Sequence, residues 1–185
     1  MEKPVWRRRA SSFIVDSPHL RLRVDEVELP NGTVVPNYYV RESHGFVIAF
    51  PVTSDGRIVL VRQYRYGSDA IHLELPAGTL DPDEDPLACA RRELLEETGY
   101  EAARWTFVTG YYAEPVRANA KARIYLALDA RKVAEPALDP TEAMEVELAT
   151  FDDFRAMLTD GRIDSGHTLV AGYRALDALE KLKGA

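Results

Sequence analysis

The chain has 185 residues, of which 46% are hydrophobic and 29% charged, a composition typical of one soluble globular domain with at most a small appendage. A single cysteine, Cys89, excludes an intrachain disulfide scaffold, and the longest apolar run, near Phe46–Val52, is far shorter than the roughly 20 residues of a membrane span. The net charge is −7, with 10 basic and 7 acidic residues in 1–65 but 13 and 23 in 66–185. This balance disfavours nucleic acid as a partner and suits either a solvated acidic surface or a protein that holds divalent cations.

The N-terminal residues do not form a secretory signal. Arg7-Arg8-Arg9 has the charge of such a segment, but polar Ser11, Ser12 and Asp16 stand where its apolar stretch would be. We therefore expect a cytoplasmic protein with no membrane partner.

Residues 1–43 are predicted to form a small antiparallel sheet. Apolar residues mostly alternate with charged ones over 20–29, Pro30-Asn31-Gly32 is a turn signal, and Thr33–Val40 is rich in β-forming residues. Two or three strands are marginally stable alone. We expect this sheet to lie on the main domain or on a second subunit, and so predict a homodimer.

Residues 44–185 are predicted to form the main domain, with strands and helices interleaved as in an α/β sandwich. One helix begins at Asp85-Pro86, a favourable N-cap followed by a favourable first helical residue, and ends at Gly99. Further strands are expected at 46–52, 57–64, 71–75, 105–112, 122–129 and 146–150, and further helices at 151–159 and 168–182.

The helix before Gly99 carries three carboxylates on one side. At 100° per residue, Glu93, Glu96 and Glu97 share an arc of about 100°. Like charges at this spacing destabilise a helix, and bound cations would offset the repulsion. A solvated acidic face is the alternative. The preceding segment Glu74–Leu80 favours a metal site, because its glycine turn brings backbone carbonyls close to a ligand and Mg²⁺ accepts carboxylate and carbonyl oxygens.

The same segment resembles the Nudix box. Gly78, Glu84, Arg92-Glu93-Leu94, Glu96-Glu97 and Gly99 have the spacing of that motif, and only Tyr100 replaces the usual aliphatic residue. The resemblance implies a Nudix hydrolase with an α/β/α sandwich, which cleaves a nucleoside diphosphate linked to another group. It also implies Mg²⁺, for which Mn²⁺ can substitute. The implied metal ligands are Glu93, Glu97, Glu96 and the carbonyl of Ala77, and Arg92 joins the catalytic set by orienting loop and helix.

The flanking residues resemble one subgroup, the ADP-ribose and nucleoside-diphosphate-sugar hydrolases. The similarity rests on Val61–Arg65, on the Glu74–Gly78 motif and on Pro115, sixteen residues beyond Gly99. Because Val116 replaces the usual glycine after Pro115, another nucleoside-diphosphate sugar is nearly as well supported as ADP-ribose. The candidate substrate-binding residues are Arg65, whose guanidinium suits phosphate, Arg62, Pro115 and Tyr38.

The resemblance also implies a catalytic glutamate in a loop after the box. Glu142 fits that position best, and Glu145 is second. Two other readings remain: a Nudix hydrolase of a dinucleoside polyphosphate, coenzyme A or an oxidised nucleotide, and a Nudix-fold sensor that binds without cleaving. Pro115 and the N-terminal sheet disfavour the first, and the complete set of box carboxylates disfavours the second.

Overall fold

The computed structural model describes residues 5–138 and 143–183, which divide into two compact units. The N-terminal unit comprises Met1–Gly45 and Tyr112–Lys121, and the main unit comprises Phe46–Tyr111 and Ala122–Ala185. The segment 112–121 is therefore part of the N-terminal unit although the chain enters and leaves it from the main unit. Nothing in the sequence pattern indicated this.

The N-terminal unit contains an antiparallel sheet in the order β1-β2-β3. Its turn between β2 and β3 forms as predicted: Gly32 has a positive φ of 83°, and the Asn31 side-chain oxygen accepts a hydrogen bond from the Thr33 amide at 3.0 Å. The expected small antiparallel sheet is confirmed. Its strands are β1 (Arg7–Asp16), β2 (Arg21–Glu28) and β3 (Val34–Glu42).

The segment 112–121 is attached to the end of β3 by backbone hydrogen bonds. The Arg41 amide donates to the Arg117 carbonyl at 2.8 Å, and the Asn119 amide donates to the Arg41 carbonyl at 3.3 Å. The Asn119 side-chain oxygen accepts from the Ser43 amide at 2.9 Å. These bonds explain why the segment groups with the N-terminal unit.

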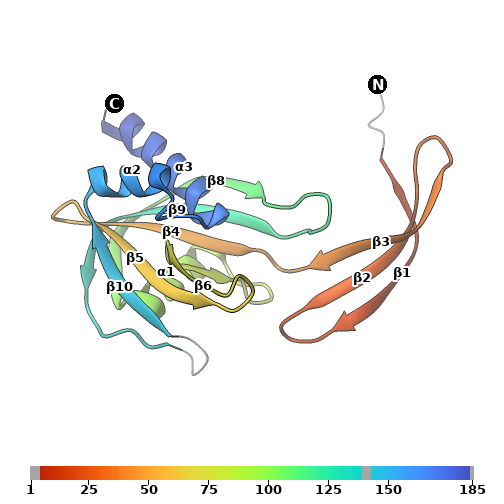
Figure 1. Ribbon diagram of the computed structural model, residues 1–185, viewed down its shortest axis with the longest axis horizontal. Helices are drawn as coiled ribbons and strands as arrows, with labels where there is room; N and C mark the ends of the chain where they lie inside the picture. Colours follow the sequence, from red (N-terminus) through yellow and green to blue (C-terminus); the bar gives the residue numbers. More distant parts are fainter. Residues whose placement is uncertain (1–4, 139–142, 184–185) are drawn as a thin grey trace. The chain divides into compact units, whose positions relative to one another are not determined.

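The main unit is a seven-stranded sheet with helices on both faces (Figure 1). The strand order is β10-β5-β4-β9-β8, with β6 paired to β5, β7 paired to β4, and β4 parallel to β9. The predicted α/β class is thereby confirmed. The elements are β4 (Phe46–Thr53), β5 (Ile58–Arg65), β6 (Ala70–Glu74), β7 (Ala77–Thr79), α1 (Pro86–Thr98), β8 (Tyr100–Tyr112), β9 (Lys121–Lys132), β10 (Met144–Ala149), α2 (Phe151–Asp160) and α3 (Gly166–Lys183).

Hydrophobic clusters fill the space between each face of this sheet and the helices that cover it. The largest cluster packs Leu60 and other sheet residues against Phe154 of α2 and Leu176 of α3. On the other face, Val59 packs with Leu94 of α1. Successive residues of a strand point to opposite faces, so the alternation along β5 fixes which side chains face α1.

The ends of α1 form as the sequence predicts. The Asp85 carboxylate accepts hydrogen bonds from the amides of Leu87 and Ala88 at 3.1 and 2.9 Å. At the other end, Gly99 is left-handed with a φ of 73°, and its amide donates to the Leu95 carbonyl. These caps fix where the helix begins and ends, and so fix the positions of its carboxylates.

Two strands differ from the expectation. β7 was not predicted, because three residues including a glycine carry no strand signal; pairing with β4, with Ala77 opposite Ile48, creates it. β8 begins at Tyr100, directly after the helix, rather than at Trp105.

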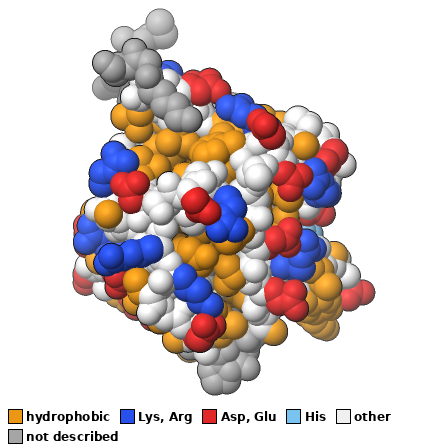
Figure 2. Space-filling model, turned by 90° about the vertical axis from the view of Figure 1, so that its left-hand side faces the viewer, with side chains coloured by type: hydrophobic (Ala, Val, Ile, Leu, Met, Phe, Trp, Pro, Cys, Tyr) orange, Lys and Arg blue, Asp and Glu red, His pale blue; other side chains and the backbone are white. Residues whose placement is uncertain are grey.

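Outside the core, oppositely charged side chains pair at the surface. Arg155 on α2 contacts Glu180 on α3 at 2.7 Å, and Figure 2 shows acidic, basic and hydrophobic side chains intermixed on one face of the molecule. Exposed pairs of this kind contribute about 0–1 kcal/mol each, so the buried clusters dominate stability. Across the described residues, none of the helices has the length and apolar character needed to span a membrane.

Candidate active site

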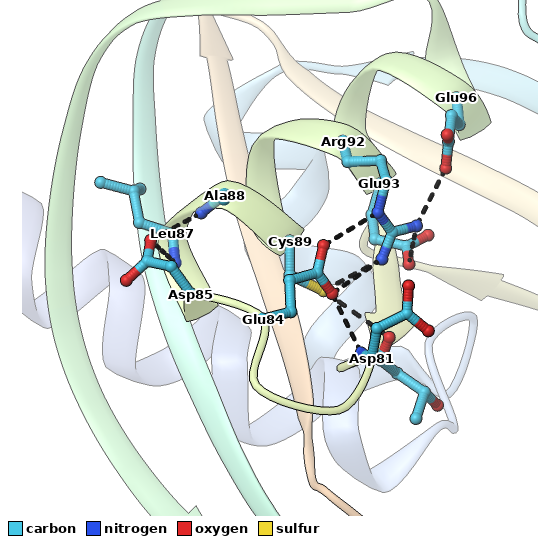
Figure 3. A network of polar contacts seen from close by, with 10 residues as sticks. Asp81, Glu84, Asp85, Leu87, Ala88, Cys89, Arg92, Glu93 and Glu96 are labelled. Carbon is cyan, nitrogen blue, oxygen red and sulfur yellow. Dashed lines mark hydrogen bonds and ion pairs between the residues drawn. The ribbon is translucent and has the colours of Figure 1, made fainter.

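Arg92 is at the centre of a polar network on α1 (Figure 3). Its Nε and Nη2 atoms donate to the two carboxylate oxygens of Glu84 at 3.0 and 3.1 Å. Its Nη1 atom lies 2.8 Å from Glu93 Oε1 and donates to Glu96 Oε2 at 3.0 Å. One guanidinium therefore ties the loop before α1 to two carboxylates of the helix.

The electrostatics of Glu84 follow from this contact. Hydrogen bonds from Arg92, together with one from the Asp81 amide at 3.0 Å, lower the pKa of Glu84 to about 2. The same pair raises the pKa of Arg92. Burial raises the pKa of the Cys89 thiol to about 12, as expected for a cysteine that packs in the core.

The other side of the carboxylate arc abuts β7. A Cβ atom on Gly78 would lie 1.9 Å from Cδ of Glu93, so only glycine leaves room for that carboxylate. Glu97 is 4% exposed, and its Oε2 accepts a hydrogen bond from the Ala77 amide at 3.0 Å. Ala77, Glu93 and Glu97 are thus brought together, and Arg92 links Glu96 to them.

These residues suit a divalent cation by their chemistry. Within residues 5–138 and 143–183, no three His, Cys, Asp or Glu side chains are grouped closely enough to hold a metal as they stand. The donors present are nonetheless those that hard cations prefer: carboxylates on one helix face beside a strand whose glycine leaves space for one of them. The residue set therefore fits such an ion.

The two candidate phosphate-binding arginines lie on opposite faces of β5. Arg65 alternates with Val59 and so shares the face toward α1; its Nε donates to Glu74 Oε2 at 2.8 Å. Arg62 lies on the other face, where its Nη2 donates to Glu147 at 2.7 Å. Only Arg65 shares a face of the sheet with the α1 carboxylates.

Tyr38 and Pro115 are brought together within the N-terminal unit. The Tyr38 hydroxyl donates to the Val116 carbonyl, and the Trp6 ring packs edge-on against Tyr38 at 5.7 Å. A cavity of about 430 Å³ lies beside them. Its lining includes Arg23, Tyr38, Val40, Tyr112, Pro115 and Asn119.

Of the two candidate general bases, Glu142 lies outside the described residues. Glu145 lies on β10 directly opposite Arg62, and directly opposed residues of antiparallel strands point to the same side. Glu145 is therefore on the face turned away from α1. Ala137, which comes before β10 in the chain, is bonded to α1, because its amide donates to the Glu96 carbonyl at 2.8 Å.

Glu74, which the sequence did not single out as a site residue, also lies on the α1 face of the sheet. Its carboxylate accepts hydrogen bonds from the Arg65 guanidinium and from the Gln63 side-chain amide, the latter at 3.1 Å. The sequence did contain a signal for these contacts. Gln63 and Arg65 alternate on one predicted strand, and Glu74 is a carboxylate on the next.

Two family models match the chain. The NUDIX domain matches residues 43–169, and the nucleoside diphosphate sugar hydrolase N-terminal domain matches residues 6–40. Together they account for both parts of the sequence.

Individual proteins agree with these matches. The methanol dehydrogenase activator of Bacillus methanolicus is 35% identical, with 89% of this chain and 88% of that protein covered. The ADP-ribose pyrophosphatase of Bacillus subtilis is 34% identical, with 88% of each covered. A crystal structure of an ADP compounds hydrolase has the same fold, with a TM-score of 0.84 at 22% identity over 98% of this chain and 97% of that one.

Proposed function

Because this chain belongs to the NUDIX domain family, we propose that it hydrolyses the pyrophosphate bond of ADP-ribose or a related nucleoside-diphosphate sugar, giving a nucleoside monophosphate and a sugar phosphate. The N-terminal match is to the nucleoside diphosphate sugar hydrolase N-terminal domain, and a relative similar over most of its length is an ADP-ribose pyrophosphatase. The observation that carries the proposal is the close approach of Glu93 to Gly78, which sets a carboxylate of α1 against the glycine of β7.

Nudix hydrolases generally need a divalent metal, and we propose Mg²⁺, with Mn²⁺ as a substitute. Glu93, Glu97, Glu96 and the Ala77 carbonyl would hold it. When bound, such an ion neutralises pyrophosphate charge and lowers the pKa of a coordinated water. The role of Arg92 is to keep Glu93 and Glu96 oriented, and Glu84 holds Arg92 in turn.

We propose Glu142 as the general base, with Glu145 in reserve. Glu142 has the position after the box at which the resemblance to the subgroup implies a catalytic glutamate. The register of β10 opposite Arg62 favours Glu142 over Glu145.

For substrate recognition, we propose that Arg65 contacts a phosphate and that Pro115 and Tyr38 contribute to the recognition of the nucleoside or sugar. Arg65 is favoured over Arg62 because it shares the α1 face of β5 and is half exposed, with 49% of its side chain accessible. We also propose a homodimer and a cytoplasmic location; the single, buried and unpaired Cys89 is consistent with a reducing compartment.

The test is a substrate panel with Mg²⁺: ADP-ribose, GDP-mannose, UDP-glucose and a dinucleoside polyphosphate, each assayed for release of nucleoside monophosphate. We expect at least one nucleoside-diphosphate sugar to be turned over faster than the dinucleoside polyphosphate. Preferential cleavage of the polyphosphate would reject the substrate class, and absence of any release with Mg²⁺ or Mn²⁺ would reject hydrolysis.

A further inference from the structure

Glu74, the last residue of β6, concentrates several contacts on one carboxylate oxygen. Its Oε2 accepts from Nε of Arg65 at 2.8 Å, lies 2.8 Å from Nη2 of the same guanidinium, and accepts from Nε2 of Gln63 at 3.1 Å. The Glu74 side chain is 12% exposed and Gln63 is 7% exposed. A carboxylate this buried needs such partners, and both come from β5.

The strand register shows in which direction this contact orients the Arg65 side chain. Arg65 stands opposite Ala70 near the hairpin turn, whereas Glu74 stands opposite Val61, four residues back along β5. That offset is about 13 Å along a strand. To meet Glu74, the Arg65 side chain must therefore lie back over Gln63, toward the segment that continues into Ala77 and Gly78, instead of extending from the turn into solvent.

The geometry leaves the guanidinium able to bind a further anion. Arginine has five N–H donors, and the Glu74 contact uses the edge formed by Nε and Nη2. The Nη1 hydrogens and the second Nη2 hydrogen remain for phosphate oxygens. A long side chain that is already ordered loses less conformational entropy when it binds such an oxygen.

The Arg62–Glu147 pair supplies an internal comparison. It has the same residue types and similar distances, 3.1 and 2.7 Å, but Glu147 is 35% exposed and the pair lies on the other face of β5. It is an ordinary surface pair by these measures, whereas Glu74 is buried, is shared with Gln63 and lies on the α1 face.

We propose that Glu74 is a positioning residue that holds the Arg65 guanidinium in place for the substrate's phosphate. The inference rests on the proposed function, in which Arg65 contacts that phosphate. Glu74 touches neither substrate nor metal in this account; it acts through Arg65. Its loss should therefore raise KM while leaving kcat almost unchanged.

The test compares Glu74→Gln, Arg65→Ala and the double variant with the parent on the preferred substrate of the panel. We expect Glu74→Gln to raise KM about tenfold, with kcat within about twofold and an unchanged Mg²⁺ requirement. In the Arg65→Ala background, Glu74→Gln should have no further effect on KM, because the interaction it removes is already absent. The matched control Glu147→Gln should keep the parent's KM.

A KM equal to the parent's in Glu74→Gln, or a full additional KM effect in the Arg65→Ala background, would overturn the positioning role. If Glu74→Gln fails to fold, Glu74→Asp keeps the charge but withdraws the carboxylate and should raise KM in the same way. If the parent cleaves nothing in the panel, the proposed function fails separately. Calorimetric titration of parent and variant with inorganic pyrophosphate and Mg²⁺ then decides: about tenfold weaker binding by Glu74→Gln supports the positioning role, and equal binding or no binding refutes it.

Discussion

At the scale of single residues, the candidate site depends on a glycine, which has no Cβ atom. Gly78 does not have a left-handed φ; it is required because Glu93 occupies the space that a Cβ would fill. The backbone of the neighbouring Ala77 binds Glu97. Two consecutive residues of a three-residue strand thus orient two carboxylates one helical turn apart.

Gly78→Ala should therefore abolish most activity with only a moderate effect on stability. The new methyl group would displace the Glu93 carboxylate, which is a flexible side chain, and would leave the backbone in place. Turnover and melting temperature should be measured together. Gly166→Ala is the control, because a Cβ there meets nothing within 4 Å. Turnover in Gly78→Ala equal to that of the control would contradict this account.

The Glu84–Arg92 pair should make stability depend on pH in the acid range. Because folding lowers the pKa of Glu84 from 4.5 to about 2, the pair stabilises the fold above pH 4.5 and loses this contribution as the pH falls toward 2. The difference in unfolding free energy between parent and Glu84→Gln, measured in denaturant, should shrink over that range. If this difference in unfolding free energy stays constant with pH, the charge of Glu84 does not stabilise the fold.

At the scale of elements, local signals predicted most of what positions the site. The ends of α1 were predicted from Asp85, Pro86 and Gly99. The spacing of its three glutamates predicted that they share one side of the helix. What the sequence could not show depends on tertiary pairing. β7 exists only through β4, and Glu74 and Arg65 meet only because of the β5–β6 register.

The attachment of 112–121 to the N-terminal unit was also unpredictable, because it rests on bonds between residues more than 70 positions apart. Asn119→Ala should release the Ser43 amide and cost about 1 kcal/mol. Trypsin should then cut more readily after Arg117 under native conditions. Asn31→Ala, which removes a similar bond in the β2–β3 turn, should leave that cleavage at the parent's rate. Equal cleavage in the two variants would mean that Asn119 does not hold the segment.

At the scale of the whole molecule, the small sheet has an exposed strand along its edge. All ten residues of β1 are exposed, including Phe13, Ile14 and Val15. Apolar side chains grouped on a sheet of three strands favour a covering partner, and a second copy of the chain is the partner proposed.

The full-length protein should therefore have the mass of a dimer in solution at micromolar concentration. Ile14→Lys, at a side chain 52% exposed, should shift it toward monomer by placing a charge in the buried contact. Light scattering coupled to size-exclusion chromatography measures both. A monomeric parent would refute the dimer, and a variant that remains dimeric would exclude this part of β1 from the interface.

We propose that the carboxylate arc of α1 supports metal-dependent cleavage of a nucleoside-diphosphate sugar. This proposal is tested most directly by measuring nucleoside monophosphate release by the parent and by Glu97→Gln at saturating Mg²⁺, with Glu101→Gln as a control outside the arc. The parent and the control should each release nucleoside monophosphate and sugar phosphate in equal amounts, and only with a divalent cation. Glu97→Gln should be slower by about 100-fold or more, a loss of roughly 3 kcal/mol of barrier lowering. Turnover by Glu97→Gln within about threefold of the parent, under 1 kcal/mol, would contradict the claim.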